Sequence, residues 1–305
     1  MSSKCWKCGD TAVIHRKYEG KSWCARHFTE QFESLVKSTI REEGLFENDD
    51  SVCVALSGGM DSSALMLFLS EMFENWRNAE LTALTIDEGI KNYRDESIEI
   101  AKEICDELGV ELHIASFKEA FGKTLDEIME DKEYGCTYCG VLRRWLLNVK
   151  SREMGADKLA TAHNLDDELQ SIFMNYLKGD MKRMLRLGAK PAVLENDKFV
   201  PRVKPFRNTP EREVALYAKI RDLELHQTEC PYVEDSLRFD VRDFLNEMER
   251  KRPSTKFTAL RAFDKLLPAL KEKFTDSEAS VQNCERCGEI TSGEVCKACE
   301  LLEKI

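Results

Sequence analysis

The stretch SGGMDSS, Ser57–Ser63, contains a pair of glycines. An apolar run precedes this pair in the sequence, and another follows it. The run before it, residues 51–57, is short and rich in β-branched side chains, which predicts a strand. The run after it, residues 62–73, is long enough for a helix. Glycines let backbone N–H groups approach an anion, and a helix that begins here directs its positive end to the same place. The stretch therefore predicts a phosphate-binding turn, although the lysine of a Walker A loop is absent.

The alternation of strand and helix continues along the chain. The apolar pattern predicts further strands at 80–87, 110–117 and 157–163, and further helices at 93–109 and 164–179. Such repeats build an α/β fold, with a parallel sheet and helices on both faces, and ligands bind at the carboxyl ends of its strands. After Pro210 the sequence is mostly helical, and we expect helices at 211–225 and 237–252.

Both ends of the chain carry paired cysteines at metal-ligand spacing. The sets are Cys5, Cys8, Cys24 and His27 at the N-terminus, and Cys284, Cys287, Cys296 and Cys299 at the C-terminus. Four soft ligands can surround one zinc ion, and a full protein ligand set leaves no position for chemistry, so each set predicts a structural Zn²⁺ site. Gly9 and Gly288 follow the second cysteine of each set and permit the tight turn that such a site needs.

Composition limits the class of protein. The chain has 305 residues, 42% of them apolar, and the apolar runs are too short for a membrane span, so we expect a globular cytoplasmic protein. A net charge of -11 argues against a chain that coats nucleic acid over its whole surface. Residues 178–207 nevertheless hold nine Lys or Arg against three Asp or Glu, and a second basic cluster spans 250–256. A solvated helix face is the ordinary explanation of such windows.

The stretch LSGGMDS resembles the signature of the PP-loop ATP pyrophosphatases, which cleave ATP between the α and β phosphates. Four further features occur in order: the terminal cysteine sets, CTYCGVLRR (136–144), TAHNLDDE (161–168) and ECPY (229–232). Together they resemble the tRNA 2-thiouridine synthetases, and among these the archaeal and eukaryotic enzymes that act on wobble uridine 34. Relatives of that group act on uridine 54. The resemblance covers nearly the whole chain.

The resemblance implies an ATP and Mg²⁺ site at the carboxyl ends of the strands. It assigns nucleotide or phosphate contacts to Ala55, Leu56, Ser57, Gly58, Gly59, Asp61, Ser62, Thr85, Ile86, Arg143, Ala162, Asp166 and Asp167. Asp61, Asp167, Arg143, Cys139 and Cys230 are the expected catalytic residues. Arg143 stands where bacterial members carry lysine, and Ala162 where glycine is frequent. An arginine can neutralise a phosphate but cannot donate a proton, so we expect no acid role at position 143.

Three cysteines remain outside the zinc sets and the interiors of predicted elements: Cys136, Cys139 and Cys230, below called the three-cysteine set. Three thiolates can hold a 4Fe-4S cluster and leave one iron without a protein ligand. By the resemblance, that iron carries the hydrosulfide for C2 of uridine. A second interpretation keeps Cys139 and Cys230 as redox thiols, one carrying a persulfide and the other resolving it. Cys53 and Cys105 fit buried structural positions.

The resemblance also implies tRNA as substrate and a homodimer, with free sulfide, a persulfide or a carrier protein as sulfur source. The expected RNA contacts are Lys178, Lys182, Arg183, Arg186, Lys190, Arg202 and Lys204. The expected organisation is an N-terminal zinc module (1–32), a PP-loop ATP-binding domain (33–208), a helical part carrying Cys230 (209–275) and a C-terminal zinc module (276–305). A different PP-loop ligase or amidase, or a non-enzymatic zinc adaptor for nucleic acid, would each use only some of these motifs.

Overall fold

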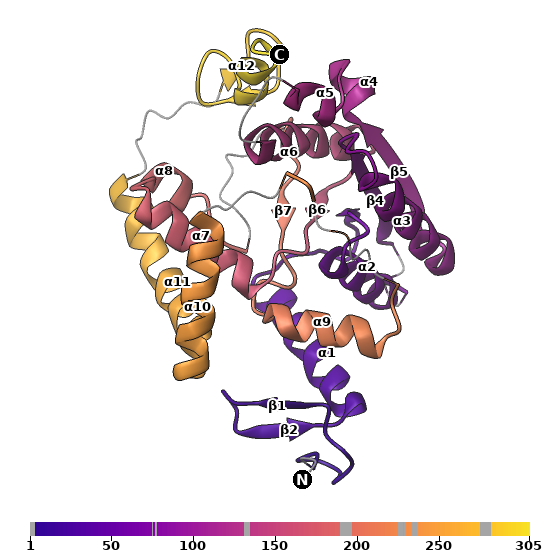
Figure 1. The fold of residues 1–305 in the computed structure, drawn as a ribbon, viewed down its shortest axis with the longest axis vertical. Helices are drawn as coiled ribbons and strands as arrows, with labels where there is room; N and C mark the ends of the chain where they lie inside the picture. The colour runs from indigo at the N-terminus through magenta and orange to yellow at the C-terminus, as the bar shows by residue number, and fades with distance from the viewer. Residues whose placement is uncertain are drawn as a thin grey trace.

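The computed structural model describes residues 4–74, 76, 78–130, 135–189, 197–224, 228, 230–232, 237–274 and 282–305. Its centre is a five-stranded parallel sheet in the order β5-β4-β3-β6-β7 (Figure 1). The strands are β3 (Ser51–Ala55), β4 (Glu80–Asp87), β5 (Glu111–Ser116), β6 (Lys158–Ala160) and β7 (Arg202–Val203). The predicted α/β class is confirmed.

Alternate residues of the strands face two different cores, as the pleat requires. One core lies between the sheet and the helices α1 (Ala25–Glu42), α2 (Met60–Phe73), α3 (Arg94–Leu108) and α9 (Glu211–Ile220). The other lies between the sheet and the helices α4 (Phe117–Phe121), α5 (Leu125–Met129), α6 (Gly135–Glu153) and α12 (Lys297–Leu302). Cys53 lies in the second core and Cys105 in the first, both buried as expected.

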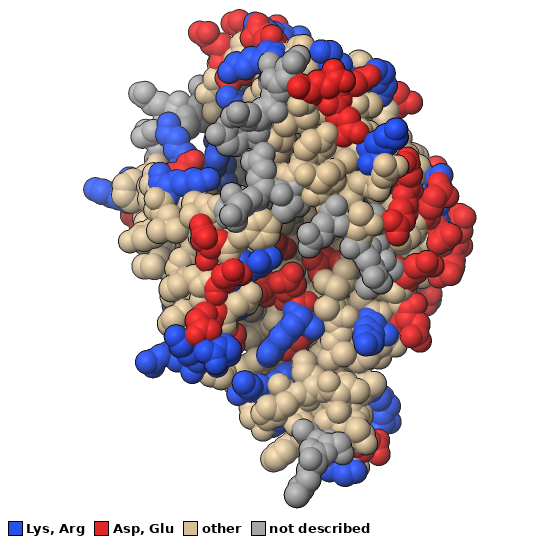
Figure 2. Space-filling view, viewed as in Figure 1, with Lys and Arg blue, Asp and Glu red and all other residues tan. Residues whose placement is uncertain are grey.

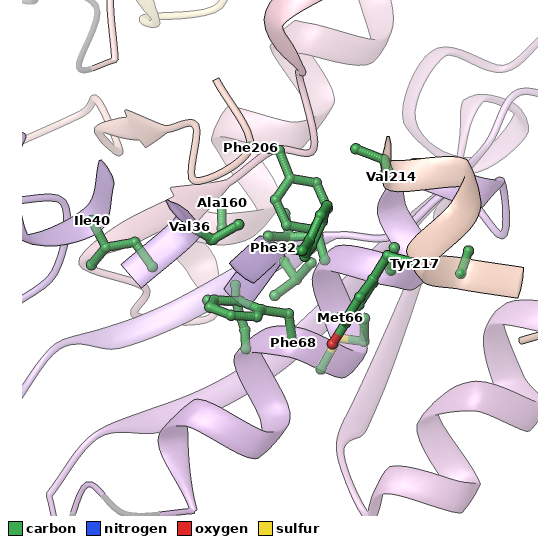
Figure 3. Packing of buried hydrophobic residues seen from close by; sticks show 14 of the residues in the cluster. Phe32, Val36, Ile40, Met66, Phe68, Ala160, Phe206, Val214 and Tyr217 are labelled. Atoms are coloured by element: carbon green, nitrogen blue, oxygen red, sulfur yellow. The ribbon is translucent and has the colours of Figure 1, made fainter. Parts of the chain in front are cut away.

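Aromatic side chains hold the first core together (Figure 3). The ring of Phe32 in α1 stacks on Tyr217 in α9 with 4.3 Å between centroids, and its edge meets Phe206 at 5.6 Å. All three side chains are fully buried. The expected boundary between residues 32 and 33 therefore falls inside α1, which joins the N-terminal zinc ligands to the sheet.

A third cluster packs beside the sheet, on the left of Figure 1. It is formed by α7 (Leu165–Leu177), α8 (Met181–Met184), α10 (Leu237–Lys251) and α11 (Thr255–Phe274). Arg207 ties this cluster to the sheet, because its buried guanidinium pairs with Glu168 in α7 and Asp264 in α11. The region expected at 209–275 is thus divided in space: α9 packs on the sheet, and α10 and α11 pack on α7.

The two cysteine-rich ends lie at opposite ends of the molecule (Figure 1). The N-terminal hairpin, β1 (Ile14–Arg16) and β2 (Lys21–Trp23), is fixed to α9 by a buried ion pair of 2.7 Å between Arg16 and Glu213. The C-terminal hairpin, β8 (Gln282–Asn283) and β9 (Ile290–Thr291), is fixed to α6 by the ion pair of Arg152 and Glu289. In the parts of the chain that the structure describes, every helix is too short or too polar to cross a bilayer.

Candidate active site and metal centres

The glycine pair forms the turn between β3 and α2. Ser62 Oγ accepts a hydrogen bond from the Ser57 N–H (3.0 Å) and donates one to the Gly59 carbonyl (2.9 Å), so the first turn of the helix closes the loop. Gly58 has φ +77°, and a Cβ there would lie 1.9 Å from the carbonyl oxygen of Ser97 in α3. The first N–H groups of a helix have no intrahelical acceptor. The turn therefore suits the oxygens of a polyphosphate.

Carboxylates gather beside this turn. Asn164 caps α7 by accepting hydrogen bonds from the N–H groups of Asp166 and Asp167, and its amide donates to Asp61 Oδ2 at 3.4 Å. Asp61 Oδ1 is buried and has no hydrogen-bond partner among the described residues. Burial, together with the charges of Asp167 and Glu211, raises the pKa of Asp61 to about 7. A divalent cation would relieve this crowding, so the acids fit Mg²⁺.

Asp166 is engaged elsewhere. Its Oδ1 forms a buried ion pair with Lys256 in α11, and its Oδ2 accepts a hydrogen bond of 2.9 Å from the Glu211 N–H. The Lys256 amine also donates to Asn246 Oδ1 at 2.5 Å. These groups lie along a cleft of about 450 Å³ between the N-terminal hairpin, α9 and the α10–α11 pair. Asp167 Oδ1 also pairs with Arg238 at 3.4 Å, but this pair is longer and more exposed than that of Asp166, so the geometry favours Asp61 and Asp167 over Asp166 as ligands for a cation.

The three-cysteine set lies at the start of α6. Cys136 and Cys139 are one helical turn apart, and the Cys136 thiol donates to the Tyr232 carbonyl at 3.2 Å. Tyr232 is anchored in turn by a hydrogen bond of 2.7 Å from its hydroxyl to Asp126. This contact brings the segment of Cys230 against the helix. Burial, together with the neighbouring Cys230 and Cys136, raises the pKa of Cys139 to about 11.

The spacing within this set differs from that in the zinc sets. In the two terminal sets all four ligand atoms lie within 4.8 Å of one another, whereas the three-cysteine set does not form such a group among the described residues. A single metal ion needs its ligands that close, but a 4Fe-4S cluster binds each thiolate on a different iron. The wider spacing therefore fits a cluster better than a mononuclear site.

A buried charge network joins the phosphate turn to the three-cysteine set. Arg94 donates to the carbonyls of Ser57 (3.1 Å) and Ile86 (2.6 Å). Its Nε lies 2.8 Å from Glu88 Oε2, an ion pair without hydrogen-bond alignment. The other oxygen of Glu88 accepts from Arg143 at 3.4 Å, and Arg143 stands one turn after Cys139 on α6. One buried carboxylate thus positions both arginines.

The Glu88→Gln variant tests this network. Glutamine keeps the shape but removes the charge, so two arginines lose their shared counterion, and we expect the free energy of unfolding to fall by about 3 kcal/mol. Denaturant unfolding measures this loss. The matched control is Glu99→Gln, an exposed partner of Lys102, which should change stability by less than about 0.5 kcal/mol. Equal stability of the two variants would contradict a structural role for the Glu88 charge.

The terminal cysteine sets have tetrahedral spacing. At the N-terminus, Cys8 Sγ lies 3.7 Å from Cys24 Sγ, and His27 Nδ1 lies 3.4 Å from the sulfurs of both Cys5 and Cys24. At the C-terminus the sulfurs of Cys287 and Cys296 are 3.6 Å apart. Tetrahedral Zn–S bonds predict sulfurs about 3.8 Å apart. The ligand atoms therefore fit one Zn²⁺ at each end.

Backbone N–H groups surround the thiols of both sets. Against the effect of burial, these hydrogen bonds lower the pKa of Cys5 to about 5 and that of Cys284 to about 6. The pKa of Cys8 is raised first by its hydrogen bond to the Asp10 carboxylate and that of Cys299 first by burial, and the neighbouring cysteines of each set raise both further. A cation is needed before all of them lose their protons. Gly9 and Gly288 have φ of +78° and +72°, as the tight turns require.

The predicted adenine contacts lie at the carboxyl end of β4. Thr85 is buried and its hydroxyl donates to the Leu56 carbonyl at 2.7 Å, while the Leu56 N–H pairs with Leu84 at 3.0 Å. The Ile86 carbonyl already accepts from Arg94. Ala55 ends β3, and Ala162 follows β6 between the sheet and the α7 cap. These residues frame the turn, and their contacts with a nucleotide stay a prediction.

His163 directly precedes Asn164, the cap of α7, but its imidazole contacts Thr161 and not the nearby carboxylates. Its Nδ1 lies 2.9 Å from Thr161 Oγ1. Partial desolvation and the surrounding cations, Lys204 and Arg202 first among them, lower the pKa of the exposed His163. The imidazole is therefore neutral near pH 7. The lowered pKa of His163 indicates a positive electrostatic potential on this side of the site.

The predicted RNA contacts fall into two groups. Four are exposed around the end of α7 and on α8, where Figure 2 shows Lys and Arg gathered at the upper left; we call them the outer basic face: Lys178, Lys182, Arg183 and Arg186. Lys190 lies outside the described residues. Arg202 is half-buried, and the Lys204 amine is buried against Glu168 at 2.5 Å. The geometry therefore favours the outer basic face over Lys204 as an RNA contact, and the contacts of all these residues with RNA stay predictions.

Sequence reasoning missed Glu88, Arg94 and Tyr232. Glu88 and Arg94 belong to DEGIKNYR (87–94), which follows the second predicted strand, and ligands of parallel sheets gather at such strand ends. A buried acid and arginine at that place could have been flagged. Nothing in the sequence indicates that the Tyr232 carbonyl meets Cys136, because that contact depends on a long-range packing arrangement.

Comparison with known proteins matches this geometry. Residues 25–248 match the PP-loop domain family, and residues 4–29 match the N-terminal LIM domain of 2-thiouridine synthetase TtuA. The tRNA 2-thiolation protein NcsA of Haloferax volcanii is 37% identical over 317 residues, which cover 99% of both chains. The chain belongs to the tRNA 2-thiolation family of PP-loop proteins.

Other members of the tRNA 2-thiolation family are similar along nearly their whole length. The cytoplasmic tRNA 2-thiolation protein 1 of Chlamydomonas reinhardtii is 36% identical over 98% of this chain and 84% of its own. A solved structure, the U34-tRNA thiolase NcsA from Methanococcus maripaludis with its 4Fe-4S cluster, has 35% identity and a TM-score of 0.86. It covers 100% of this chain and 97% of that one, so the fold and the order of its parts are shared.

Proposed function

We propose that the protein activates C2 of wobble uridine 34 in tRNA with ATP and replaces its oxygen with sulfur. Membership of the tRNA 2-thiolation family makes it a tRNA uridine sulfurtransferase. The observation that carries the proposal is the Arg94–Glu88–Arg143 network, which joins the phosphate turn to the three-cysteine set. Nucleotide activation and sulfur transfer can therefore share one reaction centre.

Each side chain has a place in the first step. The turn at Ser57–Ser63 and the start of α2 would bind the phosphates through N–H groups, and Asp61 and Asp167 would hold Mg²⁺, which neutralises phosphate charge. Uridine O2 attacks the α phosphate, and pyrophosphate leaves. Arg143 is half-exposed, fixed by Glu88 and always charged, so it stabilises the negative charge that develops on the α phosphate.

Sulfur replaces oxygen in the second step. A hydrosulfide attacks the adenylated C2, and AMP leaves with the original oxygen. A 4Fe-4S cluster on Cys136, Cys139 and Cys230 would supply an iron without a protein ligand, which can hold the hydrosulfide. Partial burial of Cys139 and Cys230 against the second core keeps bulk water from the thiols. The wide spacing of the set fits a cluster better than a single metal ion, and the persulfide route stays the alternative.

The remaining parts serve binding. Each terminal cysteine set would hold one Zn²⁺ that stabilises its hairpin against the main body. The outer basic face would meet tRNA phosphates, whereas the cluster at 250–256 is less available, because Arg250 and Lys251 pair with Glu247 and Lys256 is buried. A homodimer and a sulfide, persulfide or carrier donor stay predictions.

Reconstituted thiolation tests the proposal. The full chain, purified without oxygen, is incubated with a tRNA transcript, ATP, Mg²⁺ and sulfide, and digested RNA is analysed for 2-thiouridine by mass spectrometry. We expect 2-thiouridine at position 34, tRNA-dependent release of pyrophosphate, and about four iron and two zinc per chain. Thiolation at uridine 54 or an absence of thiouridine would contradict the proposal. Activity without iron would instead indicate direct attack by hydrosulfide, because sulfide cannot form a cysteine persulfide without an oxidant.

A further inference from the structure

Two neighbouring arginines on α6 point to different parts of the site. Arg143 meets Glu88 on the side of the phosphate turn. The Arg144 guanidinium folds back over Gly140, the residue after Cys139: its two terminal nitrogens lie 3.4 and 3.6 Å from where a Gly140 Cβ would be. Consecutive helical residues project about 100° apart, so one helix can present a cation to each of two ligands. Arg144 is the one that faces away from the buried carboxylate.

Arg202 in β7 packs against Arg144. Its Nη2 donates to the Arg144 carbonyl at 2.9 Å, and its Nε is buried without a hydrogen-bond partner among the described residues. Neither arginine forms an ion pair with an acid in the part of the chain that the structure describes, whereas Arg94, Arg143 and Arg207 do. The Arg202 guanidinium thus lies against the α6 backbone at Arg144, and neither side chain has a counterion there. A half-buried cation such as Arg202 is costly unless an anion binds.

Further cations surround the pair. Partial desolvation, with the charges of Arg143 and Arg183, lowers the pKa of the exposed Arg144, and burial with the charge of Arg144 lowers that of Arg202 to about 10. Arg183 belongs to the outer basic face, so positive charge continues from that face to the three-cysteine set. Figure 2 shows this gathering of Lys and Arg near α8. A polyanion that lies on the outer basic face would reach Arg144 and Arg202 beside Cys139.

We propose that Arg144 and Arg202 together bind one backbone phosphate of the tRNA next to the target uridine. The inference rests on the proposed function and extends it from a general basic face to one phosphate. Paired guanidinium forks suit the two free oxygens of a phosphodiester. A phosphate fixed beside Cys139 would hold the target nucleotide in register between the three-cysteine set and Arg143.

Binding to a synthetic anticodon stem-loop tests the phosphate site without requiring turnover. We expect Arg144→Gln and Arg202→Gln each to weaken binding about tenfold and to reduce the dependence of log K on log salt by about 0.7. Lys150→Gln, an exposed change on the same helix, should leave both quantities unchanged. Arg144 is exposed and carries no ion pair to an acid, so Arg144→Gln still decides the question if Arg202→Gln fails to fold.

A neutral methylphosphonate, placed at one phosphate at a time around the target uridine, locates the contact. At one position it should weaken binding to the wild type about tenfold and weaken binding to Arg144→Gln no further. Equal losses for both proteins at every position would overturn the proposal. So would a defect confined to the KM for ATP with unchanged RNA affinity, since the anion would then be a nucleotide phosphate.

Failure of the wild type to form 2-thiouridine would refute the proposed function, while these binding results would still test the phosphate site.

Discussion

Replacement of Cys230 with alanine is expected to lower 2-thiouridine formation by more than about 100-fold and to remove the iron. Cys230 reaches the start of α6 through one short segment, where the Tyr232 carbonyl accepts from Cys136. Two thiolates are too few to retain a cluster that needs three. The two zinc ions should remain, because the ligands of the terminal sets are other residues that the substitution leaves unchanged. Tightly bound iron, zinc and 2-thiouridine are measured on the same preparation.

The first chemical step should survive this substitution. The phosphate turn, the acids and Arg143 are unchanged in Cys230→Ala, so we expect tRNA-dependent pyrophosphate release in a single turnover. Cys105→Ala is the matched control: it removes a buried thiol from α3 and should keep both iron and thiolation. Retention of iron by Cys230→Ala would show that the cluster does not use this residue. Wild-type activity in an iron-free preparation supplied with a persulfide donor would favour the persulfide interpretation.

The parts of the site predicted from sequence are those set by short-range geometry. The turn at Ser57–Ser63 needs only a strand, two glycines and a helix start, and these are consecutive in the chain. The zinc sets likewise consist of pairs two residues apart, and Gly9 and Gly288 adopt the positive φ expected of them. The strand at 80–87 has the predicted bounds, because its threonines and aliphatic side chains favour a buried strand over a helix.

Contacts between distant segments could not be predicted from the same information. Lys204 lies in a basic window, yet Glu168 on α7 takes its charge inside the protein. The Cys136–Cys139 pair opens a helix of 19 residues, which a sequence with weak periodicity does not indicate. β7 has two residues and is defined only by its pairing with β6. In each case a partner far along the chain decides the environment.

Replacement of Gly58 with alanine is expected to abolish ATP binding and to destabilise the fold. A side chain at φ +77° is strained, at a cost of about 1–2 kcal/mol. The added Cβ would also lie 1.9 Å from the Ser97 carbonyl oxygen, an atom of the α3 backbone that cannot move alone. Either the turn opens, and its N–H groups no longer converge on the phosphates, or α3 shifts. We expect ATP affinity to fall more than about 100-fold, measured by calorimetry.

Two other glycines separate the causes of this effect. Gly109→Ala places alanine at φ +63° with nothing within 4 Å, so it should show the strain alone, about 1 kcal/mol in denaturant unfolding. Gly59 has φ -84°, and its Cβ would meet only the Ser57 hydroxyl at 3.3 Å, so Gly59→Ala should fold normally.

A Gly58→Ala protein that loses no more stability than Gly109→Ala and still binds ATP would show that close packing of the turn on α3 is dispensable. If Gly58→Ala instead has a much lower stability and ATP affinity than both control variants, α3 fixes the shape of the phosphate turn. Arg94 at the start of α3 bonds the Ser57 carbonyl, so the same helix would then set both the turn and the Glu88 network that holds Arg143.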